Sequence, residues 1–186
     1  NKACVLSSPA TEDIASWALT EVRDTRGNYV KYEYDTITSN SMPYAGGKQI
    51  YLKKISYTGF NNTDGKYTIE FENISRGDYF GSGRKGFLET TDKLLKNIYI
   101  RYDNQFVRAY VLNYIEGAYK KSLLKSITDV TDSTKMPYTD SINYSNPMQF
   151  AGAITHTFNY FKEEGLDFGS AQILTNETEV NKVFEF

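Results

Sequence analysis

The sequence predicts an all-β protein built on an antiparallel, hairpin-rich and twisted sheet, with little or no helix. Three observations carry this prediction: 16 tyrosines and 11 phenylalanines among 186 residues, apolar and polar residues that alternate in segment after segment, and turn residues between those segments. Flat aromatic rings pack well on a pleated, half-buried surface. A period of two places one face of a strand against a core. No segment keeps the 3.6-residue period of a helix, although residues 86–97 have room for one helical turn.

The expected strands follow one another along the chain. They span residues 17–22, 29–34, 51–57, 67–72, 98–102, 106–114, 123–129, 154–161 and 180–186. Asp64-Gly65 is predicted to form a type I′ turn, because both positions tolerate positive φ. Residues 75–92 are rich in glycine and charge and are predicted to form a long connection. The strongest hairpin reverses around Asp103-Asn104, and its second strand is apolar on both faces, so it should be central and covered on both sides.

Three regions are expected. Residues 1–16 are small and polar and are predicted to be a flexible lead-in. Residues 17–130 are predicted to form the β-hairpin domain. Residues 131–186 are expected to be a further β segment, possibly the start of a next repeat or subdomain, after a turn-rich stretch with Pro137 and Pro147. The start at Asn1, with no signal peptide in view, is what a piece of a longer protein would show.

Composition argues against several kinds of partner. The 21 basic residues are spread among 23 acidic ones, and the net charge is −2. No basic block is present that could release counterions from a nucleic acid, so we expect no nucleic acid partner. No apolar run approaches the ~20 residues that a bilayer-spanning helix needs, so we expect no membrane span.

The residue types that most enzymes and metal sites use are scarce. His156 is the one histidine and Cys4 the one cysteine, far apart in the sequence. Nucleophilic catalysis usually needs a base beside the nucleophile, and zinc sites need several such ligands. We interpret His156 as a packed or hydrogen-bonded strand residue, and Cys4 as an incidental thiol rather than a lipoprotein cleavage site. We predict no internal disulfide, no catalytic residue, no cofactor and no metal site, and expect the chain not to be an enzyme.

Several polar motifs have a functional and a plainer interpretation, and we favour the plainer one for each. Glu70 and Glu72 share a strand face, as a glycosidase pair could, but cross-strand Lys or Arg partners explain them. Residues 61–65 lack the regular carboxylates of a calcium loop and suit a tight turn. The tripeptide Arg76-Gly77-Asp78 is interpreted as a chance match to adhesion motifs. The glycines and basic residues over 81–85 are interpreted as a connection rather than a phosphate site, and Glu163-Glu164 as part of a turn.

One element recurs along the chain. The pattern Leu-Lys-x-Ile appears at residues 52–55, 95–98 and 124–127, each time after an aromatic-rich strand. The copies begin 43 and then 29 residues apart, so they do not form a uniform solenoid. We interpret the pattern as a repeated hairpin, in which Leu and Ile anchor the start of the second strand while Lys stays in water.

The order of these motifs resembles a known family. The segment from Gly27 to Asp35 resembles the YD repeat of Rhs and toxin-complex proteins, a glycine-led strand that ends in Tyr-x-Tyr-Asp. The wider block, about residues 17–130, resembles the N-terminal region of SpvB/TcB-type bacterial toxin-complex proteins. The matching motifs are Trp17-Ala18-Leu19, Tyr32-Glu33-Tyr34, residues 52–57, residues 69–72, Arg76-Gly77-Asp78, Arg84-Lys85-Gly86, residues 95–98, residues 107–114 and residues 122–127.

The resemblance implies a function. It suggests a non-catalytic structural or scaffold segment of a larger secreted or surface bacterial protein of the virulence-associated toxin type, which contributes strands to a β shell. The partners it implies are the remaining strands of the parent polypeptide, and possibly an enclosed toxin polypeptide or other toxin-complex subunits. The alternative is a surface β module that binds carbohydrate or protein through exposed tyrosines, because such modules often use aromatic platforms.

Overall fold

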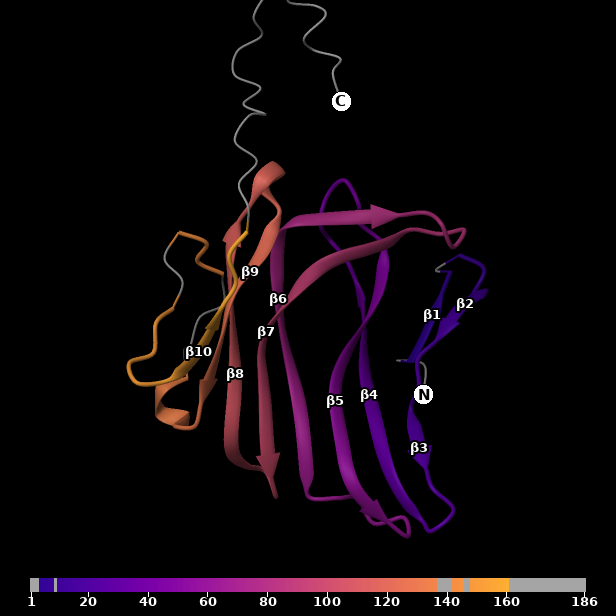
Figure 1. The fold of residues 1–186 in the computed structure, drawn as a ribbon. Helices are drawn as coiled ribbons and strands as arrows, with labels where there is room; N and C mark the ends of the chain where they lie inside the picture. Colours follow the sequence, from indigo (N-terminus) through magenta and orange to yellow (C-terminus); the bar gives the residue numbers. More distant parts are fainter. Residues whose placement is uncertain (1–3, 9, 137–141, 146–147, 161–186) are drawn as a thin grey trace, which may run out of the picture.

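The computed structural model describes residues 4–8, 10–136, 142–145 and 148–160, and these residues form one large open sheet and one small hairpin (Figure 1). The large sheet has eight strands in the order β10-β9-β8-β7-β6-β5-β4-β3, and each neighbouring pair is antiparallel. The predicted all-β, antiparallel fold is confirmed. The elements are β1 (Val5–Ser7), β2 (Ile14–Trp17), β3 (Glu21–Arg23), β4 (Asn28–Thr38), β5 (Lys48–Phe60), β6 (Tyr67–Ser82), β7 (Glu89–Tyr102), β8 (Gln105–Glu116), the 3₁₀ turn η2 (Ala118–Lys120), β9 (Ser122–Val130), the 3₁₀ turn η3 (Ser133–Lys135) and β10 (Ile154–Thr157).

Part of the predicted lead-in is ordered, so that prediction was wrong for the segments around 5–7 and 14–17. β1 and β2 pair as an antiparallel hairpin, and Leu6 in β1 is among the most buried side chains. β1 lies against β5 of the large sheet. The predicted strand over 17–22 is divided, because β2 ends at Trp17 and β3 begins at Glu21. These strands are too short and polar to show a period, and their pairing comes from contacts distant in sequence.

The region from 75 to 92 is not a long connection, and residues 86–97 hold no helical turn. β6 continues to Ser82 and β7 begins at Glu89, so only residues 83–88 connect them. At the top of Figure 1 the end of β6 and the start of β7 bend away from the rest of the sheet and run toward β1 and β2. The register shifts between Ser75 and Phe80, where the strand bends. The hydroxyl of Thr90 donates to the carbonyl oxygen of Tyr44 at 2.8 Å and ties this arm to the loop before β5.

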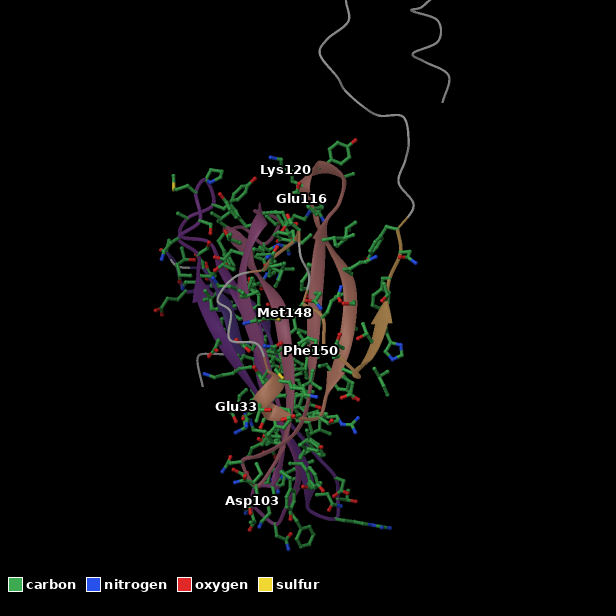
Figure 2. The ribbon with its side chains drawn as sticks, turned by 90° about the vertical axis from the view of Figure 1, so that its left-hand side faces the viewer. Glu33, Asp103, Glu116, Lys120, Met148 and Phe150 are labelled. Carbon is green, nitrogen blue, oxygen red and sulfur yellow. The ribbon has the colours of Figure 1, made fainter. Side chains whose placement is uncertain are left out.

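Two hairpins reverse through pairs of residues with positive φ. Asn61-Asn62 ends β5, and the backbones of Phe60 and Thr63 exchange two hydrogen bonds across them. The turn therefore lies at Asn61-Asn62, and the prediction of a type I′ pair at Asp64-Gly65 was wrong. Gly65 has a different role, because a Cβ there would lie 1.9 Å from the carbonyl oxygen of Tyr57. The predicted turn at Asp103-Asn104 is confirmed, and it lies at the opposite end of the sheet from Lys120 (Figure 2).

The Leu-Lys-x-Ile motif marks a β-bulge each time it occurs. In the pairing of β4 with β5, Glu33 lies opposite Lys54 and Tyr34 lies opposite Leu52. Lys53 is therefore the extra residue of β5. The register of β6 with β7 skips Lys96 in the same way, and that of β8 with β9 skips Lys125. The bulges lie in the second strands of three successive hairpins, β4–β5, β6–β7 and β8–β9. Because a bulge bends its strand and increases the twist, the repeated motif curves the sheet.

Two details of the predicted motif need correction. In β5 and β7 the motif lies in the middle of the strand rather than at its start. Lys96 does not stay in water: it is buried, and its ammonium nitrogen lies 3.5 Å from Oε1 of Glu72. Lys53 remains exposed and pairs with Asp35 at 3.1 Å. The repeated hairpin itself is present in all three places.

The turn at Asp103-Asn104 offers a test of the local conformation. Asn104 has φ of 63°, a region that asparagine and glycine tolerate and other residues enter at a cost. Asn104→Ala is expected to lower the free energy of unfolding by about 1 kcal/mol, while Asn104→Gly should leave it nearly unchanged. Urea unfolding followed by circular dichroism measures both. Equal losses in the two variants would show that the side chain of Asn104, rather than its backbone, matters.

Candidate functional site

One side of the large sheet carries most of its apolar side chains, and we call it the apolar face. Residues that pair across neighbouring strands point to the same side, so the register assigns each one. One row across the strands runs from Tyr32 through Ile55 and Ile69 to Ile100. A second row joins Phe71, Ile98 and Tyr110, and a third joins Leu112 with Ile127. The apolar face is thus defined by Tyr32, Ile55, Ile69, Phe71, Ile98, Ile100, Tyr110, Leu112 and Ile127.

None of the side chains that define the apolar face is fully buried. Each is half-buried, shielded by its neighbours on the same sheet. The central position predicted for β8 is confirmed. On its apolar side Tyr114 is buried while Tyr110 and Leu112 remain half-buried, and Val107 is exposed, so the expected cover on both sides is only partly present. Contiguous apolar surface of this kind usually marks a site of interaction with further polypeptide.

The opposite face is more polar, yet it holds the best-buried residues. Over β7, β8 and β9 these are Asn97, Ala109, Val111, Asn113, Ser126, Thr128 and Val130. Residues 148–150 lie beside this face. The side chain of Asn113 donates to the carbonyl oxygen of Met148 and accepts from its amide, both at 3.2 Å. A side-chain amide therefore pairs with the backbone much as a neighbouring strand would.

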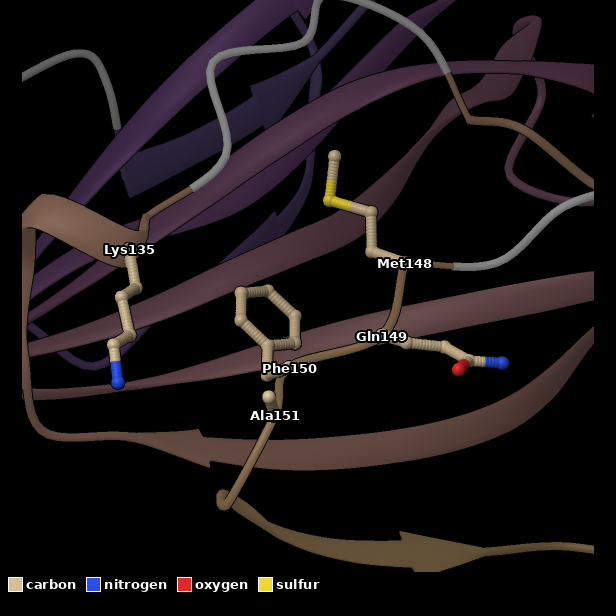
Figure 3. A pocket seen from close by; sticks show the side chains of 5 residues that line it. All are labelled: Lys135, Met148, Gln149, Phe150 and Ala151. Carbon is tan, nitrogen blue, oxygen red and sulfur yellow. The ribbon is translucent and has the colours of Figure 1, made fainter.

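A shallow groove of about 450 Å³ lies between this segment and the edge of the sheet. It is lined by Lys125, Ser126, Met148, Gln149, Phe150, Thr155 and Thr157. A second hollow of about 360 Å³ lies on the other side of Phe150, beside Lys135 (Figure 3). The linings combine hydroxyls, an amide and lysines, but contain no carboxylate or imidazole.

A half-buried polar network lies on the polar face where β6 meets β7. Oε2 of Glu72 accepts hydrogen bonds from Asn97 Nδ2 and from the Tyr99 hydroxyl, both at 2.7 Å. Burial alone would raise the pKa of Glu72, but these hydrogen bonds and the charge of Lys96 outweigh it and lower that pKa. Burial, together with the hydrogen bond to Glu72, raises the pKa of Tyr99 to about 12. The two directions agree, so Glu72 is a carboxylate and Tyr99 is neutral at ordinary pH.

The predicted cation partners of Glu70 and Glu72 are present. Arg101 Nε lies 2.9 Å from Oε2 of Glu70, and Lys96 pairs with Glu72. Both carboxylates are thus engaged in hydrogen-bonded contacts with neighbouring strands. This arrangement agrees with the interpretation of the two carboxylates as cross-strand partners of basic side chains.

Arg76-Gly77-Asp78 lies within β6, and its two charged side chains bind each other. Arg76 donates two hydrogen bonds to the two oxygens of Asp78, at 2.9 and 2.8 Å. Asp78 also accepts from the amide and the hydroxyl of Ser122 at the start of β9. The Arg76 guanidinium, helped by Ser122, holds the pKa of Asp78 well below its usual range despite burial. An adhesion receptor would need both side chains exposed, so the geometry supports the plainer interpretation of this tripeptide.

Tyr57, Tyr67 and Tyr102 form a row of rings across three strands at one end of the apolar face. The ring centres of Tyr57 and Tyr67 are 5.4 Å apart, and the planes of these two rings are nearly parallel. The ring centres of Tyr67 and Tyr102 are 4.7 Å apart. The planes of Tyr67 and Tyr102 are inclined by 51°, so the three rings do not lie in one plane. Tyr67 and Tyr102 remain 38% and 43% exposed.

The other candidates from the sequence lie apart from one another. His156 lies on the edge strand β10, as its interpretation as a strand residue expects, but its side chain is exposed rather than packed. Cys4 is half-buried before β1. Within the described ranges no group of three or more His, Cys, Asp or Glu residues could hold a metal ion. Glu163-Glu164 and the strand predicted over 180–186 lie outside the described residues.

Comparison with known proteins gives matches in structure but not in sequence. No protein-family model matches, and no curated protein matches either. The crystal structure of TcdB2-TccC3-Cdc42 superposes with a TM-score of 0.57 at 17% identity over 69% of this chain and 9% of that one. The structure of the Tc holotoxin pore of Photorhabdus luminescens superposes with a TM-score of 0.58 at 17% identity, over 69% of this chain and 8% of that one. The N-terminal domain of the effector SpvB from Salmonella typhimurium strain LT2 superposes with a TM-score of 0.53 at 15% identity, over 86% of this chain and 56% of that one.

This chain has a fold of the SpvB and Tc-toxin type. The resemblance inferred from the order of motifs is confirmed at the level of fold. The YD-repeat likeness of residues 27–35 stays a prediction. The chain spans less than a tenth of the Tc-toxin chains it matches and about half of the SpvB domain structure. Among the described residues, no helix combines the length and the apolar character needed to cross a bilayer.

Proposed function

We propose that this chain is a non-catalytic structural segment of a larger secreted or surface bacterial protein of the toxin type. It contributes strands to a β shell, and further strands of the parent polypeptide cover its apolar face. One observation carries this proposal: the apolar face runs across β4 to β9 with none of its defining side chains fully buried. An apolar surface of that extent is costly in water and is normally covered by protein.

The structural neighbours support the same proposal. Each is an SpvB or Tc-toxin protein, and in the Tc-toxin chains the matched fold is a small part of a much larger polypeptide. The remaining strands of the parent are therefore the first expected partner. An enclosed toxin polypeptide or other toxin-complex subunits are further partners. The scarcity of histidine and cysteine supports the non-catalytic role, because the common nucleophilic and zinc-dependent mechanisms rely on them.

A substitution on the apolar face tests the proposal. Ile100 is half-buried in the chain by itself, so Ile100→Asp should cost the isolated chain about 1–2 kcal/mol of unfolding free energy. In the full-length parent polypeptide the same substitution would bury a carboxylate beneath further strands, and should cost at least about 2 kcal/mol more. Urea unfolding of both forms measures the difference.

Thr38→Asp, at an exposed position on β4, is the matched control and should cost equally little in both forms. Equal costs of Ile100→Asp in the isolated and full-length forms would overturn the proposal, because they would mean that nothing covers the apolar face. A surface module that binds carbohydrate or protein is the competing function. Glycan-array binding that disappears in Tyr67→Ala would favour that alternative.

A further inference from the structure

The hairpin that joins β8 to β9 ends in a turn of unusual composition. Tyr119 and Lys120 adopt φ of 55° and 57°, and the amide of Lys121 donates to the carbonyl oxygen of Ala118 across them. Figure 2 shows Glu116 and Lys120 at this tip, at the opposite end of the sheet from Asp103. Non-glycine residues enter this left-handed region at a cost, and two in succession double it.

The other tight turns of the same chain avoid that cost. Asn61-Asn62 and Asp103-Asn104 hold the same pair of positive φ angles, and asparagine and aspartate are the non-glycine residues that tolerate them best. Glu12 and Thr58 also have positive φ, but each is a single residue, whereas Tyr119 and Lys120 follow one another. Residues held in strained conformations concentrate at functional sites, where the side chain is worth more than the local stability it costs.

The strained tip displays a large aromatic side chain on a firm support. Tyr119 is 76% exposed, the highest value among the large exposed hydrophobic side chains described. The amide of Gly117 donates to the carbonyl oxygen of Lys121 at 2.8 Å and closes the base of the turn. A Cβ on Gly117 would lie 2.3 Å from Cδ1 of Leu123, so glycine lets Leu123 pack directly beneath the turn. A ring presented on an ordered turn loses little entropy on binding, which favours tyrosine as an interaction hot spot.

The surroundings of Tyr119 carry positive charge. A hollow of about 250 Å³ beside the tip is lined by Gly77, Asp78, Tyr79, Glu116, Tyr119, Lys120, Lys121 and Tyr144. Asp78 in this lining is already neutralised by Arg76. The remaining charged side chains of the lining are one carboxylate, Glu116, and two lysines, Lys120 and Lys121, so the net charge of the tip is positive. A complementary surface would offer a pocket for an aromatic ring with carboxylates at its rim.

We propose that Tyr119, Lys120 and Lys121 form a docking tip for an acidic segment elsewhere in the parent protein assembly. The ring of Tyr119 enters an apolar pocket of that segment, and carboxylates at its rim pair with the two lysines. This inference rests on the proposed function, because it takes the neighbour from the rest of the parent assembly. A protein neighbour is favoured over a lipid surface because the same fold occurs within large protein chains.

Site-specific photo-cross-linking tests the proposal in the full-length parent polypeptide. p-Benzoylphenylalanine in place of Tyr119 should give one dominant cross-link, mapped by mass spectrometry to an acidic segment outside residues 1–186. The same reagent in place of Asn104, at the other end of the sheet, should not reach that segment. Adding Lys120→Glu and Lys121→Glu should lower the yield at position 119 at least tenfold, while Lys120→Arg with Lys121→Arg should preserve it.

A second measurement tests the strain. In the 186-residue chain, Tyr119→Asn with Lys120→Gly should move the urea midpoint to a higher concentration, because these residues suit the turn. An unchanged or lower midpoint, a cross-link yield unaffected by charge reversal, or no protein cross-link at position 119 would overturn the proposal. Binding of the full-length protein to phosphatidylglycerol vesicles that is lost in Tyr119→Asn would overturn it in favour of a membrane surface. None of these outcomes changes the result for Ile100→Asp, so the docking tip can fail while the proposed function stands.

Discussion

Tyr114→Ala is expected to lower the free energy of unfolding by about 3–5 kcal/mol. Few large apolar side chains are buried in the described residues, and Tyr114 on β8 is one of them at 7% exposure. Its hydroxyl donates to the carbonyl oxygen of Leu95 at 2.6 Å, which joins β8 to β7 beside the second bulge. Burial raises the pKa of Tyr114 to about 12, so the hydroxyl keeps its proton throughout the usual pH range. The substitution removes both the packed ring and this hydrogen bond.

Urea unfolding monitored by circular dichroism measures the loss. Tyr114→Phe should cost only about 1 kcal/mol, because the ring stays and one hydrogen bond is lost. Tyr110→Ala, on the half-buried apolar face of the same strand, is the matched control and should cost clearly less than Tyr114→Ala. If the two alanine variants cost the same, Tyr114 would not be a centre of the core. Because small domains are stable by only about 5–15 kcal/mol, Tyr114→Ala should also lower the yield of folded chain.

Asp78→Asn is expected to cost about 3–5 kcal/mol at pH 7, since it leaves the half-buried Arg76 without its partner charge. The loss should depend on pH. The pKa of Asp78 is lower in the folded chain than in the unfolded one, so its contribution is complete above the unfolded pKa of about 3.9. As the pH falls below that value toward the folded pKa, the contribution is lost. The difference between the two proteins should therefore shrink on acidification.

Urea unfolding at pH 7, 4, 3 and 2.5 follows this change. Asp35→Asn is the control, because Asp35 forms an exposed ion pair with Lys53, and its loss should change the free energy of unfolding by less than about 1 kcal/mol at pH 7. A difference between the parent chain and Asp78→Asn that stays constant from pH 7 to 2.5 would contradict the role of the ionised Asp78. The same comparison tests the interpretation of the tripeptide, since a structural ion pair is unavailable to a receptor.

The sequence by itself determined the fold class and most of the hairpins. Alternation over 67–72 predicts which residues share a face, and the register confirms Tyr67, Ile69 and Phe71 on one side. The positive φ at Asp103-Asn104 follows from the residues alone, because the preference is local. The turn at Asn61-Asn62 had an equally local signal, which the neighbouring Asp-Gly pair obscured.

The tertiary structure alone decided what covers each face. Alternation tells which side chains lie together, but it says nothing of the segment that will pack on them, because that contact is distant in sequence. The polar face gained the segment around Met148, while the apolar face of Ile69 and Ile100 remained half-exposed. The bulges at Lys53, Lys96 and Lys125 likewise depend on the pairing of two strands. The sequence therefore shows the repeated motif, but it does not predict the bend that the motif introduces into the sheet. The all-β scaffold was thus predictable from local pattern, whereas the half-exposed apolar face emerged only from the packing of the residues that the structure describes.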